Sequence, residues 1–270
     1  MLQSNRLGNT PPVVLNLIII NALFLLITKV MGNSGTSLVD MLGLHTFFSP
    51  EFRVWQLFTN IFLHGDFWHL FFNMFSLWMF GRILEQVWGG KKFLIYYLAT
   101  GVGASILNSL VNIAEIEMLR RSAEEVLANM SPDAFFSFIS QHASAFKAGL
   151  NDEFMTQWYK TPDNPMFIRE AKNVIYMIIQ NRESVVTIGA SGSVFGVLLA
   201  FGMLFPNMMI MLLIPPIPLK AKYMVMIFAG IELFFGFSGK QPGIAHFAHL
   251  GGMLVGFFII RYWRKHNSLY

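Results

Sequence analysis

The chain contains no cysteine, which excludes a disulfide framework, a thiolate metal site and a cysteine nucleophile. Charged residues are also scarce: they make up 13% of the 270 residues, whereas a soluble domain has about 25%. Hydrophobic residues account for 54%, and the mean hydropathy is +0.53. The composition therefore predicts a membrane protein. The basic residues form no patch of the kind that binds nucleic acid, so no nucleic-acid partner is expected.

Apolar residues gather in six segments, each close to the length that a helix needs to cross a bilayer: 12–30, 67–84, 93–111, 186–205, 223–237 and 244–263. We therefore expect an all-α membrane protein, a six-transmembrane-helix bundle over residues 12–270 that follows a short cytoplasmic tail, 1–11. A polar segment, 112–185, interrupts this domain between the third and fourth helices. We expect it to be a helical extramembrane insertion.

Residues within the insertion give helix signals. Ser131 and Asn164 each precede a proline, which is the pattern of an N-cap followed by the first helical residue. The insertion is also rich in aromatic residues, which we expect to pack on one another or on the membrane surface: Phe135, Phe136, Phe138, Phe146, Phe154 and Trp158. The apolar stretch 208–218 is broken by three prolines and predicts an interfacial or extended strap rather than a helix.

Basic residues predict the orientation of the bundle. If the N-terminus is cytoplasmic, the short outer loops hold only Lys29, Arg53 and Lys240, and the inner side holds the majority: Arg6, Arg82, Lys91, Lys92, Lys220, Lys222, Arg261, Arg264 and Lys265. This is the positive-inside bias, and it predicts that both termini are cytoplasmic. The second, fourth and sixth segments then start on the outer side. Their polar residues would therefore meet at one level in the outer half of the bilayer.

Two motifs at the starts of apolar segments carry the chemistry. Gly189-Ala190-Ser191-Gly192 opens the fourth segment, and His249-Leu250-Gly251-Gly252 lies in the sixth. Gly196 and Gly256 repeat the small residue one turn later in each, which predicts two helices packed closely enough for Ser191 and His249 to form a hydrogen bond. A serine and a histidine in that relation are a nucleophile and its general base. Either residue alone has a structural explanation, as a helix cap or an interhelical hydrogen-bonding group.

His69 and Asn73 are four residues apart and share one face of the second segment. Both side chains are suitable donors to an oxyanion, although Asn73 has the alternative of bonding a neighbouring helix backbone. A metal site built from His64, His69, His246 and His249 is a further alternative. The sequence disfavours it because His246 and His249 lack the H-E-x-x-H spacing and have no acid between them. We expect no metal and no cofactor.

Together these residues resemble the rhomboid family of intramembrane serine proteases. The matching positions are Gly189-x-Ser191-Gly192, His69-x-x-x-Asn73, Ala248-His249-Leu250-Gly251-Gly252, and Gly81 with Glu85 and Gly89. The resemblance implies a Ser191–His249 dyad without an acid, and cleavage of membrane proteins in or near their transmembrane helices. It further implies an oxyanion hole of Asn73, His69 and the Ser191 backbone N–H. Glu85 would be a structural residue at the cytoplasmic end, as would Gly189, Gly192, Gly196, Gly252 and Gly256 at the helix contacts.

The chain departs from the family pattern at Gln56, which follows Trp55 where the family often has arginine. This change puts the usual hydrogen bonding of that loop in doubt. The resemblance also leaves two classes open, an active protease and a pseudoprotease that binds membrane clients without cutting them. Retention of both Ser191 and His249 favours the protease. A small transporter is disfavoured because the chain shows no internal repeat. Such a protease would act on transmembrane proteins in a bacterial inner membrane, with its site open to the outer side.

Overall fold

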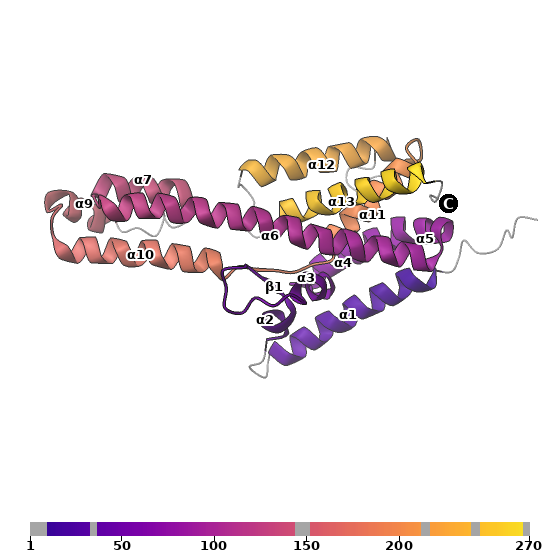
Figure 1. Ribbon diagram of the computed structural model, residues 1–270, viewed down its shortest axis with the longest axis horizontal. Coiled ribbons are helices and arrows are strands. Elements are labelled where there is room, and N and C mark those ends of the chain that lie inside the picture. The colour runs from indigo at the N-terminus through magenta and orange to yellow at the C-terminus, as the bar shows by residue number, and fades with distance from the viewer. Residues whose placement is uncertain (1–9, 33–36, 144–151, 212–216, 239–243, 267–270) are drawn as a thin grey trace, which may run out of the picture. The chain divides into compact units, whose positions relative to one another are not determined.

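The computed structural model describes residues 10–32, 37–143, 152–211, 217–238 and 244–266 (Figure 1). Helices dominate this part of the chain, which confirms the predicted all-α class. The chain divides into two compact units. One comprises Met1–His45, Glu51–Ser109 and Val186–Tyr270, and the other comprises Thr46–Pro50 and Leu110–Val185. Phe146 and most of the predicted tail lie outside the described residues.

The helices of the first unit follow the predicted apolar segments: α1 (Pro12–Gly32), α4 (Phe67–Ser76), the π-helical η2 (Leu77–Gly81), α5 (Arg82–Trp88), α6 (Gly90–Ala128), α11 (Ser191–Leu204), α12 (Ala221–Ser238) and α13 (His246–Lys265). Among the described residues, α1, α6 and α12 are the helices long and apolar enough to cross a membrane by themselves. The second predicted segment is divided among α4, η2 and α5, and α11 is apolar but shorter.

The predicted end of the third helix near residue 111 is wrong, because α6 runs without interruption from Gly90 to Ala128. The sequence after residue 111 becomes charged but holds no glycine or proline, and its alanine, glutamate, leucine and arginine residues all favour a helix. A change in polarity alone therefore does not end a helix here. Residues 90–109 of α6 belong to the first unit and residues 110–128 to the second.

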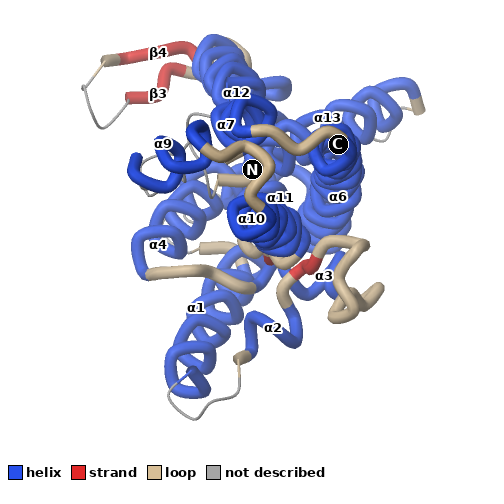
Figure 2. The backbone as a smooth tube through the Cα atoms, turned by 90° about the vertical axis from the view of Figure 1, so that its left-hand side faces the viewer, coloured by secondary structure: helices blue, strands red, loops and turns tan. Residues whose placement is uncertain are grey.

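Short elements connect the helices of the first unit: α2 (Leu38–Leu42), β1 (Leu44–His45), α3 (Gln56–Thr59), η1 (Asn60–Phe62), β2 (Val186–Thr187), β3 (Met209–Met211) and β4 (Pro218–Lys220). β1 pairs with β2 in an antiparallel arrangement. β3 also pairs with β4 in an antiparallel arrangement (Figure 2). The β1–β2 pair ties the loop after α1 to the residues just before α11. The β3–β4 pair occupies the described ends of the predicted strap, and Pro215 and Pro216 lie outside the described residues.

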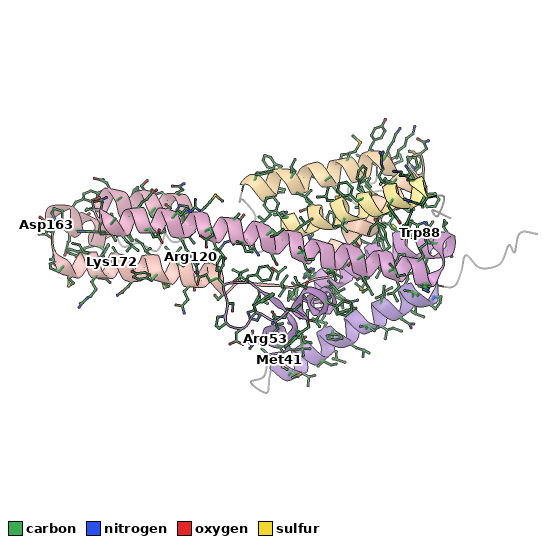
Figure 3. The ribbon with its side chains drawn as sticks, in the orientation of Figure 1. Met41, Arg53, Trp88, Arg120, Asp163 and Lys172 are labelled. Carbon is green, nitrogen blue, oxygen red and sulfur yellow. The ribbon has the colours of Figure 1, made fainter. Side chains whose placement is uncertain are left out.

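Gly81, Glu85 and Gly89 form the corner where α5 meets α1. The carboxylate of Glu85 is buried and accepts hydrogen bonds from the backbone N–H groups of Val13, at 2.9 Å, and Val14, at 2.8 Å. These donors belong to the first turn of α1, which has no intrahelical acceptors for them. A side chain on Gly81 would press on Val14, and Gly89 turns the chain into α6 at a φ of +76°. Aromatic packing of Trp88 on Tyr96 and Trp263 continues this core (Figure 3).

The second unit has its own apolar core, built by the end of α6 with α7 (Pro132–His142), α9 (Asp152–Lys160) and α10 (Pro165–Glu183). Ser131 accepts from the N–H of Ala134 and Asn164 accepts from the N–H of Met166, which confirms both predicted N-caps. The aromatic residues pack on one another as expected, with Trp158 fully buried against Phe135 and Phe154. Phe136 is 39% exposed.

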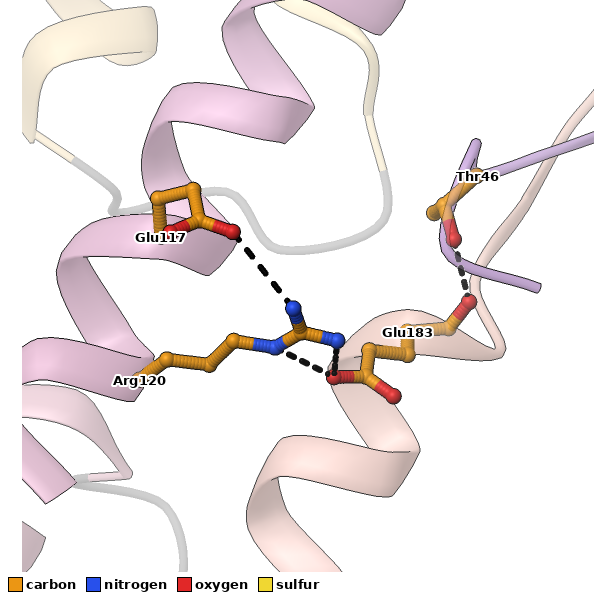
Figure 4. Close-up of polar contacts among 4 residues, drawn as sticks. All are labelled: Thr46, Glu117, Arg120 and Glu183. Atoms are coloured by element: carbon orange, nitrogen blue, oxygen red, sulfur yellow. Dashed lines mark hydrogen bonds and ion pairs between the residues drawn. The ribbon is translucent and has the colours of Figure 1, made fainter. Parts of the chain in front are cut away.

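Arg120 links the two long helices of the second unit (Figure 4). Its guanidinium donates to Glu183 of α10 through Nε at 2.9 Å and Nη2 at 2.7 Å, and it lies 3.4 Å from Glu117 of its own helix. The backbone carbonyl of Glu183 accepts a hydrogen bond from the hydroxyl of Thr46 at 2.6 Å. These charged contacts are partly exposed, so they orient the helices while the apolar core supplies most of the stability.

Replacing Glu85 by glutamine should destabilise the protein. The amide keeps one acceptor oxygen, so one N–H group in the first turn of α1 loses its partner in a buried place. A lost hydrogen bond to a charged group costs about 1–3 kcal/mol. The thermal unfolding midpoint in detergent should therefore fall for Glu85→Gln and stay unchanged for Gln86→Ala, the exposed neighbour on α5. Equal midpoints for both variants would contradict the structural role of Glu85.

Candidate functional site

Ser191 is the first residue of α11, and the residues before it are fixed by contacts within the first unit. The N–H of Gly189 donates to the carbonyl of Asn60 at 3.0 Å, and Thr187 accepts from the amide of Asn108 at 3.2 Å. Gly189 has a φ of +130°, which strongly favours glycine, and a side chain there would press on the ring of His69. These contacts hold the residues before Ser191 in one conformation and place the His69 ring beside Gly189.

The structure brings Ser191 and His249 together. The Oγ of Ser191 lies 2.8 Å from the Nε2 of His249 on α13, across a helix contact where the two backbones nearly touch. A methyl group added to Gly252 would overlap the carbonyl oxygen of Gly192, so only a glycine permits this approach. Polar side chains that start on two different helices can then reach each other without bending either helix.

Gly196 of α11 and Gly256 of α13 face α6 and not each other. This corrects the prediction that both pairs of glycines lie at the contact between α11 and α13. A side chain on Gly196 would meet Thr100 at 2.7 Å, and one on Gly256 would overlap the hydroxyl of Tyr96. Both partners lie on α6. Tyr96 also donates to the carbonyl of Gly196 at 2.8 Å. A single helix therefore supports both α11 and α13 one turn below the Ser191–His249 contact.

His249 has two further neighbours. Its ring stacks on Phe195 of α11, with ring centroids 4.3 Å apart and planes 3° from parallel. Its Nδ1 lies 2.9 Å from the Oε2 of Glu232 on α12. The sequence reasoning missed Glu232 and expected a dyad without an acid. A signal was present, because Glu232 is the one charged residue within the predicted span 223–237, where ionisable residues usually have a function.

His69 and Asn73 lie on α4, as their spacing predicts. Asp66 is the N-cap of this helix and accepts from the backbone N–H of His69 at 2.9 Å, a bond that lowers the pKa of the Asp66 carboxyl. Asn73 is buried, and its Nδ2 has no hydrogen-bond partner among the residues that the structure describes. A buried donor without a partner is costly, so the Nδ2 of Asn73 has an unused capacity to donate a hydrogen bond.

One group of residues has the composition of a metal site: Glu232, His246 and His249. Nδ1 of His246 lies 2.6 Å from the same Oε2 of Glu232 that His249 approaches. Two ligands of one zinc ion, each about 2.0–2.2 Å from it in a tetrahedral arrangement, lie farther apart than these atoms do. The spacing therefore fits direct contact of the carboxylate with the two imidazoles, and the contact with His246 is a hydrogen bond. His64 packs on His69, with ring centroids 5.0 Å apart, and is not part of this group.

Gln56 supplies the loop hydrogen bonds that the departure from the family pattern put in doubt. Its side chain is buried, and its Oε1 accepts from the backbone N–H groups of Arg53 at 3.0 Å and His45 at 3.3 Å. Its Nε2 donates to the carbonyl of Glu51 at 3.0 Å. Met41 lies on α2, before this loop, and Arg53 lies within it (Figure 3). A neutral amide thus bonds the loop backbone from inside, without an arginine.

Comparison with known proteins gives one consistent result. The model of a family described as "Rhomboid domain" matches residues 51–116 and 167–266. RHOMBOID-like protein 1 of Arabidopsis thaliana is 43% identical over 66 residues, 24% of this chain and 17% of its own. Rhomboid protease GluP of Bacillus subtilis (strain 168) is 44% identical over 52 residues, 19% of this chain and 10% of its own. Rhomboid-like protease 1 of Toxoplasma gondii is 35% identical over 57 residues, 21% of this chain and 20% of its own. The matched region spans a fifth or less of each of these relatives.

Replacing Gly252 by alanine should separate α11 from α13. The new methyl group has no room beside the Gly192 carbonyl, and overpacking of this kind costs about 1–3 kcal/mol. The thermal midpoint in detergent should fall. Gly230→Ala on α12 is the matched control, because a methyl group there meets nothing within 4 Å. A Gly252→Ala protein as stable as the control would contradict the close contact.

Proposed function

Because the chain belongs to the rhomboid family, we propose that this integral membrane protein is a serine endopeptidase that cleaves other membrane proteins in or near their transmembrane helices. The observation that carries the proposal is the 2.8 Å contact between the Oγ of Ser191 and the Nε2 of His249. A serine hydroxyl becomes a useful nucleophile when an adjacent base accepts its proton, and this contact has the required length.

The proposed reaction is acyl transfer to Ser191. Neutral His249 takes the hydroxyl proton through Nε2 as Oγ attacks the scissile carbonyl carbon, and then gives this proton to the leaving amine. Water enters, loses a proton to the same nitrogen, and releases the acyl group as a carboxylic acid. The stack on Phe195 holds the imidazole in one plane throughout, so the nitrogen stays directed at Ser191.

We propose that Asn73, His69 and the backbone N–H of Ser191 form the oxyanion hole. The unpartnered Nδ2 of Asn73 supports this role, as does the place of the His69 ring against Gly189, two residues before the nucleophile. Ser191 begins α11, and the preceding Ala190 makes no side-chain cap bond to the helix. Backbone N–H groups at a helix start favour negative charge.

The membrane arrangement is also part of the proposal. Six spans would come from α1, the continuous run of α4, η2 and α5, then α6, α11, α12 and α13, with residues 112–185 as the extramembrane insertion. The charged contacts of Arg120 in the second unit support an aqueous setting for that unit. The basic residues support cytoplasmic termini, which would open the site to the outer side of a bacterial inner membrane.

A fluorophosphonate probe tests the nucleophile without a known substrate. The probe should label the detergent-solubilised wild type and fail to label Ser191→Ala. The labelling rate of His249→Ala should fall at least about a thousandfold, because loss of the base in a soluble serine protease lowers kcat by about 10⁶. Ser193→Ala is the matched control, a fully buried serine on the same helix that should label like the wild type. Absence of labelling in folded wild type would favour a pseudoprotease.

Loss of the Asn73 amide should slow the same labelling reaction. Removal of one oxyanion donor typically lowers the rate by about 10²–10³. We expect that reduction for Asn73→Ala in the second-order rate constant for labelling. Asn21→Ala serves as control, because this buried asparagine donates to Leu17 within its own helix. A labelling rate for Asn73→Ala within threefold of the control, a difference of roughly 0.7 kcal/mol in activation free energy, would contradict a role for Asn73 in the oxyanion hole.

A further inference from the structure

Glu232 is an isolated acid within an apolar helix. The sequence of α12 is AKYMVMIFAGIELFFGFS, and its other charged residue, Lys222, lies in the first turn. The side chain of Glu232 is only 12% exposed. A carboxylate taken out of water is unfavourable unless it gains charged or hydrogen-bonding partners, and such residues are retained in membrane helices mainly for function.

Both contacts of this carboxylate are to imidazoles on α13. Its Oε2 lies 2.6 Å from the Nδ1 of His246 and 2.9 Å from the Nδ1 of His249. The contact with His246 is a hydrogen bond, whereas the contact with His249 is a close polar contact in which Nδ1 makes no aligned hydrogen bond to the described residues.

The contact favours one of the two neutral forms of the His249 ring. A carboxylate oxygen 2.9 Å from Nδ1 attracts a proton on that nitrogen and repels a lone pair there, even without an aligned hydrogen bond. The neutral ring is therefore favoured with its proton on Nδ1 and its lone pair on Nε2. That lone pair is directed at Ser191, 2.8 Å away. The imidazolium formed after proton transfer would also lie beside a negative charge.

We propose that Glu232 is a positioning residue for His249, so that Ser191, His249 and Glu232 form a serine–histidine–glutamate relay across α11, α13 and α12. The proposal rests on the proposed function of Ser191 and His249. His246, which shares the carboxylate, holds Glu232 in place from the same helix that carries His249. The relay differs from a dyad because the orientation and tautomer of the base depend on a third helix.

Two substitutions separate positioning from structure. Glu232→Leu keeps the approximate side-chain volume but leaves the buried imidazole of His246 without its acceptor, so the thermal midpoint should fall. At a temperature at which this variant is folded, we expect its labelling rate at saturating fluorophosphonate to fall by about 10²–10⁴, the larger value being that for the buried acid of a soluble triad. The probe concentration at half-saturation should not change. The labelling rate of Glu232→Gln should lie between the rates of the wild type and Glu232→Leu, because its amide oxygen can still accept a hydrogen bond from the Nδ1 of His249.

Ile231→Leu is the matched control, since Ile231 is the exposed neighbour on α12. A Glu232→Leu protein that labels at the rate of this control would overturn the relay and leave the Ser191–His249 proposal intact. Wild type that fails to label would instead overturn the proposed function, and the relay would then be decided by a measurement that needs no activity.

That measurement is ¹⁵N NMR of histidine-labelled protein in detergent, with His249→Ala used to assign the His249 signals. We expect His249 with the proton on Nδ1 in the wild type, and a shift toward the other tautomer in Glu232→Leu. Unchanged tautomers would overturn the proposal. A metal is the remaining alternative: labelling or thermal stability that is lost after dialysis against EDTA and restored by zinc would also overturn it.

Discussion

The contact between the backbones of α11 and α13 is the constraint on which the site depends. Gly192 and Gly252 meet where no side chain fits, and Ser191 and His249 stand one and three residues before these glycines. The close approach of α11 and α13 comes from packing at these glycines and from polar contacts, as is typical of helices in a bilayer. The distance between the Oγ of Ser191 and the Nε2 of His249 thus depends on backbone packing.

α6 contacts both α11 and α13 and so supports their packing on each other. Tyr96 bonds the carbonyl of Gly196, and its hydroxyl fills the space left by Gly256, so one side chain contacts both helices of the site. Gly101 and Gly103 of α6 similarly admit Ser193 and Val255. α6 therefore packs against both of the helices that carry Ser191 and His249.

The sequence predicted the helix caps and the contact between Ser191 and His249, and it failed at other features that depend on tertiary contacts. Ser131 and Asn164 were predicted as caps because a cap is decided by neighbouring residues. The all-α class followed from composition. The partners of Gly196 and Gly256 were assigned wrongly, since spacing identifies a small-residue face but not the helix that packs on it. Glu232 was missed because a lone acid belongs to no motif, and its contacts with His246 and His249 on another helix are visible only in the structure.

Glu85 is buried and Glu232 is largely shielded from solvent, and the two glutamates show why partners, not burial alone, decide a role. Glu85 is bonded through both oxygens to backbone N–H groups of α1, which do not move separately from the helix. These partners give it a structural role. Glu232 faces two imidazoles, each of which can gain or lose a proton and rotate about its side-chain bonds. A carboxylate with such partners responds to every change of charge on the base beside Ser191, which is what a proton-transfer site requires and a helix cap does not.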